Sequence, residues 1–262
     1  MSGSKFILSA AVLGTLLGIG SASAADLPAR TYTKAPTVVA APSWTGFYIF
    51  GGAGGGVWDA NNYQSNLGNV VTINQKTGGD GFFGTAGAGY DWQFNRSWVA
   101  GILADGQFGG LKGQINGVSL AGPVAGSEKL LDTWAVGGRA GYLVAPNVLS
   151  YVNAGYTQSY WSSSALGLVN GAPATIFTPS FNKGGWFVGG GVENNLDIFG
   201  ITAPGLFMKT EYRGAYFGRA DLTESNAAGP TTAVASFKPF VQTISTSLVY
   251  RFNWTGPVVA KY

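Results

Sequence analysis

The alternation of apolar and polar residues is most regular in residues 242–252. One face of this run is apolar and aromatic, with Ile244, Thr246, Leu248, Tyr250 and Phe252. The other face is small, polar or charged, with Thr243, Ser245, Ser247, Val249 and Arg251. Because successive side chains of a strand point to opposite faces, the run predicts a strand between an apolar and a polar environment. The same pattern recurs seven times upstream.

Eight strands are predicted in all, at residues 45–58, 81–94, 97–110, 131–144, 149–161, 185–196, 206–217 and 240–252. Shorter connections at 95–96, 145–148 and 197–205 alternate with longer segments at 59–80, 111–130, 162–184 and 218–239. This asymmetry is typical of bacterial outer-membrane barrels. The predicted fold class is all-β: an eight-stranded antiparallel transmembrane β-barrel with four long outer loops and both termini in the periplasm.

Outward aromatic residues fall into two groups along the predicted strands. The group near the short turns is Tyr90, Trp92, Phe94, Trp98, Tyr142, Tyr250 and Phe252, and the group near the long loops is Phe82, Phe108, Trp134, Tyr160, Trp186 and Tyr216. Two such girdles match the two interfaces of a bilayer. The alternative, a soluble barrel, would have its apolar side chains inside. Glycines obscure the period of strand 45–58, so its faces are not assigned.

Composition and the N-terminus agree with an exported membrane barrel. Only 10% of the 262 residues are charged, and the net charge is +3. Residues 1–24 resemble a secretory signal peptide, with Lys5 before a short apolar core and a cleavage site formed by Ala22 and Ala24. The predicted organisation is a signal peptide at 1–24, a Pro-rich periplasmic leader at 25–43, the outer-membrane barrel at 44–254 and a short tail at 255–262.

Eight charged side chains are predicted to point into the barrel and to form an interior charge network. They are Asp91, Asp105, Arg139, Glu193, Lys209, Glu211, Arg213 and Arg251, four acids and four bases. Charges in a narrow interior must be paired, and we expect Asp105 to pair with Arg139. The network either fills the barrel or lines a narrow path for ions or solutes. Eight strands leave little room inside, which favours a filled barrel.

The sequence gives little support for catalysis, metal binding or nucleic-acid binding. The chain has neither histidine nor cysteine, so it has no thiol and lacks the commonest general base and metal ligand. We therefore predict no enzymatic activity, no catalytic residues, no cofactor and no metal site, and the scattered Lys and Arg residues argue against nucleic-acid binding. Asp221 and Glu224 could together bind a cation, but a solvated loop is the simpler interpretation.

Several short motifs resemble one known family. They are Ala25-Asp26-Leu27-Pro28, the segment from Trp44 to Tyr48, Gly89-Tyr90, the segment from Gly137 to Tyr142, the segment from Gly189 to Glu193, the segment from Lys209 to Tyr212 and the segment from Leu248 to Phe252. Together these resemble the RopB-like or outer-membrane immunogenic proteins of alphaproteobacteria. Two features depart from the family pattern: ten residues follow Phe252, and Leu103 stands where the family often has a second inward acid.

The resemblance implies an outer-membrane barrel with exposed variable loops and a role in envelope integrity. It also implies an assembly signal formed by Leu248, Tyr250 and Phe252 and read by the barrel-assembly machinery. Expected partners are outer-membrane lipid and lipopolysaccharide, with the loops as the part that host surfaces or phage would contact. The leading hypothesis is a structural barrel whose interior is plugged by the charge network. The alternatives are a narrow porin and an envelope tether acting through residues 25–43.

Overall fold

The computed structural model describes residues 43–72, 75–119, 122–171, 173–200 and 203–252. The predicted signal peptide and its cleavage site lie outside these residues, as do all but the last residue of the leader and the C-terminal tail. In the described part of the chain, no helix is long and apolar enough to cross a membrane.

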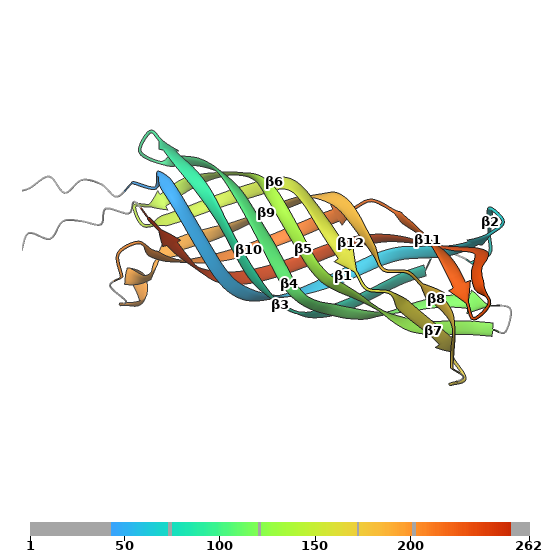
Figure 1. The fold of residues 1–262 in the computed structure, drawn as a ribbon. Helices are drawn as coiled ribbons and strands as arrows, with labels where there is room; N and C mark the ends of the chain where they lie inside the picture. The colour runs from blue at the N-terminus through green and yellow to red at the C-terminus, as the bar shows by residue number, and fades with distance from the viewer. Residues whose placement is uncertain (1–42, 73–74, 120–121, 172, 201–202, 253–262) are drawn as a thin grey trace, which may run out of the picture. The chain divides into compact units, whose positions relative to one another are not determined.

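Eight antiparallel strands form a closed ring, as predicted (Figure 1). They are β1 (Gly46–Asn66), β3 (Gln75–Phe94), β4 (Trp98–Ser119), β5 (Gly122–Ala145), β6 (Val148–Trp161), β9 (Phe181–Asn195), β10 (Leu206–Phe217) and β12 (Gly229–Arg251). Each strand pairs with the next in this order, and β12 pairs with β1 along nearly the whole length of both strands. Closure therefore leaves no unpaired sheet edge in the ring.

The four long connections of the predicted barrel are present, but they are largely strand rather than irregular loop. The strands β1, β3, β4, β5 and β12 continue far into them, and they add β2 (Asn69–Val70), β7 (Ser164–Leu168), β8 (Ala174–Thr178) and β11 (Ala220–Asn226). Beyond the end of β6, strand β5 pairs with β7 instead, and β7, β8, β11 and β12 continue the pairing. We call this part the distal extension.

The short connections lie at the other end of the ring. Residues 95–97 form a tight turn in which Asn95 has φ 58°, a conformation that asparagine tolerates well. Pro146 and Asn147 form the next turn, and a short 3₁₀ helix η1 (Leu196–Phe199) begins the third connection, which reaches Gly205 with φ 80°. All three positions agree with the turn residues read from the sequence.

The outer surface carries the predicted aromatic side chains. Phe82 is 86% exposed, and Trp92, Trp98, Phe108 and Trp186 are each about half exposed or more. Trp98 and Phe108 are ten residues apart on β4, which is about 33 Å along a strand and about 25 Å across a bilayer at the usual strand tilt of roughly 40°. That height matches the apolar band of about 25 Å that a transmembrane β-barrel presents to lipid, and the distal extension continues past it.

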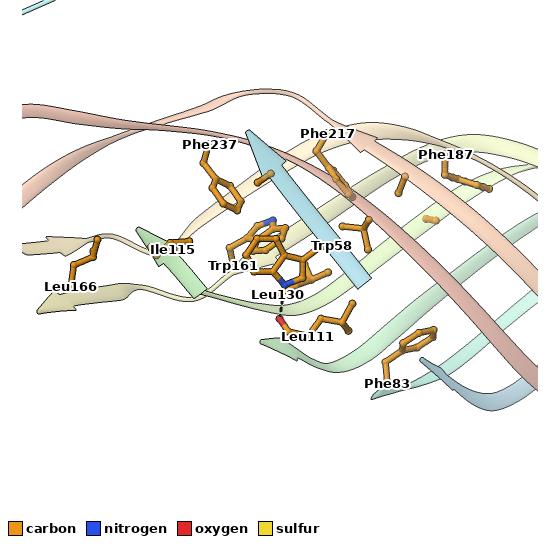
Figure 2. Packing of buried hydrophobic residues seen from close by; sticks show 14 of the residues in the cluster. Trp58, Phe83, Leu111, Ile115, Leu130, Trp161, Leu166, Phe187, Phe217 and Phe237 are labelled. Atoms are coloured by element: carbon orange, nitrogen blue, oxygen red, sulfur yellow. Dashed lines mark hydrogen bonds between the residues drawn. The ribbon is translucent and has the colours of Figure 1, made fainter. Parts of the chain in front are cut away.

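The interior is filled by two apolar clusters (Figure 2 shows the larger). In the larger one, the Trp58 ring lies 5.3 Å from that of Trp161 and 5.7 Å from that of Phe237, and the Trp58 indole N–H donates to the Leu111 carbonyl. The smaller cluster lies at the turn end, where Trp44 packs on Phe207. Strand β1, whose faces the sequence left open, directs Tyr48, Phe50 and Trp58 inward and Phe47, Ile49 and Val57 outward.

Candidate functional site: the buried charge network

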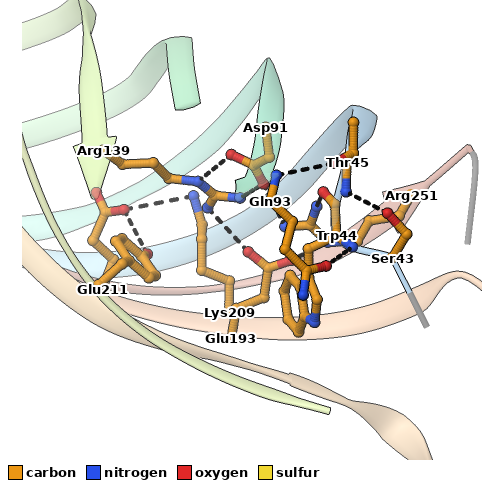
Figure 3. A network of polar contacts seen from close by, with 11 residues as sticks. Ser43, Trp44, Thr45, Asp91, Gln93, Arg139, Glu193, Lys209, Glu211 and Arg251 are labelled. Atoms are coloured by element: carbon orange, nitrogen blue, oxygen red, sulfur yellow. Dashed lines mark hydrogen bonds and ion pairs between the residues drawn. The ribbon is translucent and has the colours of Figure 1, made fainter. Parts of the chain in front are cut away.

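Four buried side chains form the first ion-pair group, which Figure 3 shows: Asp91, Arg139, Glu193 and Arg251. Arg139 donates through Nε to Asp91 Oδ1 at 2.9 Å and through Nη1 to Glu193 Oε2 at 3.0 Å, and its Nη2 contacts Asp91 Oδ2. Arg251 donates through Nε to Glu193 Oε1 at 2.8 Å and through Nη2 to Asp91 Oδ2 at 2.8 Å. Each arginine thus bridges both carboxylates, and the formal charges of the group cancel.

The second ion-pair group consists of Asp105, Lys209, Glu211 and Arg213. Arg213 binds Asp105 through two parallel hydrogen bonds of 2.8 and 2.7 Å and donates to Glu211 Oε1 at 2.8 Å. Lys209 Nζ lies 3.7 Å from Glu211 Oε2, which also accepts a hydrogen bond from the Tyr151 hydroxyl at 2.8 Å. This group is also neutral as a whole. Because a two-pronged guanidinium–carboxylate pair fixes both partners, it restrains β10 against β4 across the barrel.

Every cation of the two groups lies over an aromatic ring. The guanidinium carbon of Arg139 is 4.3 Å from the centre of the Tyr48 ring, and that of Arg251 is 4.4 Å from a Trp44 ring. Lys209 Nζ lies 3.3 Å from the centre of the Phe50 ring, and Arg213 lies 4.4 Å from that of Phe187. Desolvated cation–π contacts of this kind contribute about 2 kcal/mol each.

Glycines on the neighbouring strands make room for the network. A Cβ atom at Gly101 would lie 2.1 Å from Asp91 Oδ1 and 2.7 Å from the Tyr90 carbonyl oxygen. At Gly89 it would lie 2.3 Å from the Tyr48 hydroxyl oxygen. These positions accept no side chain without displacing the buried charges or the backbone.

All eight residues predicted for the interior are buried, and the structure brings them together in two sets of four. The predicted pair of Asp105 with Arg139 is wrong: Asp105 binds Arg213, and Arg139 binds Asp91 and Glu193. The number of residues between each charged residue and its short turn does not show which side chains meet across the barrel.

The sequence reading also missed the inward aromatic residues that accompany the cations. Tyr48 and Phe50 lie on β1, where glycines and apolar residues on both faces remove the alternation. Their orientation follows from the register of the structure, in which Tyr48 pairs with Arg251 and both therefore face the interior, and the sequence does not show that register.

The arrangement of the two ion-pair groups favours a structural role over a catalytic or metal-binding one. Each carboxylate of the two groups accepts a hydrogen bond from a cation, so none is left as a free base or nucleophile. Within the described ranges, no three or more acidic side chains are grouped so as to hold a metal ion. Around the network, the Trp44 cluster occupies the turn end and the Trp58 cluster occupies the side toward the distal extension.

Comparison with known proteins agrees with this architecture. Residues 13–255 match the family model of the outer membrane protein beta-barrel domain. The chain belongs to this family. Its membership places the protein in the bacterial outer membrane.

Two curated relatives are 31 kDa outer-membrane immunogenic proteins, from Brucella melitensis and Brucella suis. Each is 28% identical to this outer-membrane barrel over 214 residues, which is 78% of the chain and 84% of the relative. The resemblance to the alphaproteobacterial immunogenic proteins is thereby confirmed. Among solved structures, the outer membrane protein OprG from Pseudomonas aeruginosa aligns with a TM-score of 0.52 at 11% identity, covering 79% of this chain and 97% of OprG, which supports the fold alone.

Proposed function

We propose that this barrel is a structural, non-enzymatic component of the outer membrane that contributes to envelope integrity and has no permanent pore. The observation that carries the proposal is the filled interior: two neutral ion-pair groups with an apolar cluster on each side. An ion crossing this interior would have to leave water at the apolar clusters, which costs several kcal/mol or more.

In this proposal the turn end and both termini face the periplasm, and the distal extension faces outward. The extension is then the part that lipopolysaccharide, host surfaces or phage would contact. Leu248, Tyr250 and Phe252, which lie on the outer face of β12 and its end, form the signal for the barrel-assembly machinery. Their exposed side chains support that role, because such a signal has to be read from outside the barrel.

The alternative, a narrow porin, requires Trp58, Trp161 and Phe237 to separate. These rings are within 6 Å of one another, and all three side chains are almost fully buried. A conducting state would therefore need a rearrangement of the larger cluster as well as of the ion pairs.

Single-channel recording tests the proposal directly. Refolded mature protein, residues 25–262, would be inserted into a planar bilayer, with folding checked by the shifted band of a folded barrel in unheated gels. We expect no conductance steps. Reproducible steps that change when Asp105 or Arg213 is neutralised would overturn the proposal and establish a channel with the network as its filter.

A further inference from the structure

The distal extension contains a second buried acidic site, separate from the charge network. A cavity of about 40 Å³ lies between β1, β4, β5, β7, β8, β11 and β12, and its lining includes Gln64, Glu128, Thr178 and Glu224. That volume holds roughly three water molecules. Most of the remaining wall is apolar, with Ile115, Leu166, Leu222 and Phe237 among the lining residues, whereas the rim at Asn62, Tyr63 and Thr72 is half-buried.

Glu128 is 2% exposed and is held in place by hydroxyl groups. Ser164 donates to its Oε2 at 2.5 Å, and Ser162 donates to Oε1 at 3.4 Å. In the described part of the chain, no lysine or arginine side chain pairs with this carboxyl group. The contrast with the charge network is clear, because every carboxylate there contacts at least one cation.

Glu224 is 4% exposed, so the expectation of a solvated loop was wrong at this position. Its Oε1 accepts a hydrogen bond of 2.6 Å from the Gln64 side-chain nitrogen. Gly117 provides space for that amide, since a Cβ atom there would lie 3.1 Å from it. Like Glu128, Glu224 has no cationic partner among the described residues.

Two further oxygen atoms at the cavity lack a partner. Thr178 is 4% exposed and its Oγ1 makes no hydrogen bond to any described residue, and the same holds for the buried Oδ1 of Asn62. Both residues line the cavity. A buried oxygen without a partner costs about 1–3 kcal/mol, so such atoms indicate a position where a donor group would bind favourably.

We propose that this cavity binds the ammonium group of a small primary alkylamine. A primary ammonium carries three N–H donors and no acceptor, which matches a site rich in carboxylate, amide and hydroxyl oxygens. Its single positive charge would balance one of the two buried acids, and its first carbon atoms would contact the apolar wall. A fully hydrated metal ion suits this wall less well, because its water shell needs polar partners on all sides.

The protonation of Glu128 supports the proposal. Burial raises the pKa of this carboxyl group to about 7, although the bonds from Ser164, Lys129 and Ser162 oppose the shift. Burial raises the pKa of Glu224 as well, opposed by Gln64. A bound cation favours the ionised form of both groups, so binding near neutral pH should release protons. Binding should also weaken strongly between pH 8 and pH 5.5.

Isothermal titration calorimetry tests the proposal on the refolded mature protein in non-ionic detergent. The probe is n-propylamine, added at pH 7 in buffers that contain no primary amine. We expect saturable binding at one site, with a heat that varies with the ionisation enthalpy of the buffer. E128Q and E224Q should each weaken binding at least tenfold, about the loss expected for one hydrogen bond to a charged group. T178V, which replaces the hydroxyl group by a methyl group, should weaken it less.

The matched control is D59N, which neutralises a half-exposed acid paired with Lys76 in the same extension and should bind normally. Unheated gels and thermal unfolding confirm that each variant is folded. If E128Q or E224Q fails to fold, the effect of T178V on propylamine binding decides whether the proposal holds. The proposal fails if propylamine shows no saturable binding, if E128Q, E224Q and T178V all bind like the parent, or if Ca²⁺ binds at this site and propylamine does not.

Discussion

Arg139 gives the most direct test of the charge network. It contacts Asp91 through two nitrogens and Glu193 at 3.0 Å, and it is buried. In R139M an unbranched apolar side chain would replace it, leaving two buried carboxylates to share Arg251. Removing one partner of a buried ion pair costs about 3–5 kcal/mol. With a urea dependence of about 2–3 kcal/mol per molar, the unfolding midpoint should fall by roughly 1–2 M.

The measurement is urea unfolding in lipid vesicles, followed by tryptophan fluorescence and by the gel shift of the folded barrel. Adding E193Q to R139M restores neutrality, with one acid and one arginine left, and should recover about half of the loss. Adding D105N should recover nothing, because Asp105 belongs to the second group, so the two costs should add within about 0.5 kcal/mol. K112M, at an exposed lysine, is the control and should change stability by less than about 0.5 kcal/mol. A stable R139M protein, or rescue by D105N, would refute the pairing.

Three further predictions concern single positions. G101A would place a methyl group 2.1 Å from Asp91 Oδ1 and should lower the free energy of unfolding by at least about 1–3 kcal/mol, the usual cost of overpacking a core, in the same urea assay. W58A removes the ring that touches Trp161 and Phe237 and should cost about 3–5 kcal/mol; an unchanged midpoint would show that this cluster is not packed as described. Because the pKa of Glu128 is raised from 4.5 to about 7, the folded protein binds more protons than the unfolded chain between these values. Stability of the distal extension should therefore fall by up to about 3 kcal/mol from pH 4.5 to pH 8 through Glu128, seen as faster hydrogen exchange, and E128Q should remove this contribution and leave only that of Glu224.

The membrane-spanning part of the fold could be predicted because its constraint is simple. Every second residue faces lipid, and the turns at one end are short, so alternation and turn residues locate the strands well. The start of β4 at Trp98 and the bounds of β10 agree with the sequence reading. The strand ends on the side of the long connections differ from the prediction, because beyond the bilayer the alternation no longer separates lipid from interior. Polar and glycine-rich sequence there was taken as loop, although β5 continues back to Gly122 and β12 begins at Gly229.

The candidate site was only partly predictable for a related reason. Alternation identifies which side chains point inward, but the partner of each charge depends on contacts across the ring between strands distant in sequence. A register shift adds a second obstacle. The pairing of β5 with β6 shifts between Leu130 and Asp132. On the turn side of this shift odd-numbered residues such as Arg139 face inward, whereas on the side of the distal extension even-numbered residues such as Glu128 are buried. A shift of one residue exchanges the two faces of a strand, and no local sequence pattern indicates where it occurs.

The ion pairs explain why a filled interior carries charge at all. An apolar filling would hold the same volume, and replacing a buried ion pair by apolar residues is often neutral for stability. A purely apolar strand, however, could slip by one residue with little penalty, because lipid and interior would then accept the same side chains. With the network in place, the same slip of β10 would move Lys209 and Arg213 into lipid, at up to about 2–4 kcal/mol for a cation at the bilayer centre. A slip of β12 would move Arg251 outward at the level of the turn-end girdle, where the cost is about 0–1 kcal/mol. A slip of β10 would also leave Asp105 without its partner Arg213, and a slip of β12 would leave Asp91 and Glu193 with Arg139 alone. The network therefore specifies strand register, which hydrophobic packing alone does not do in a membrane.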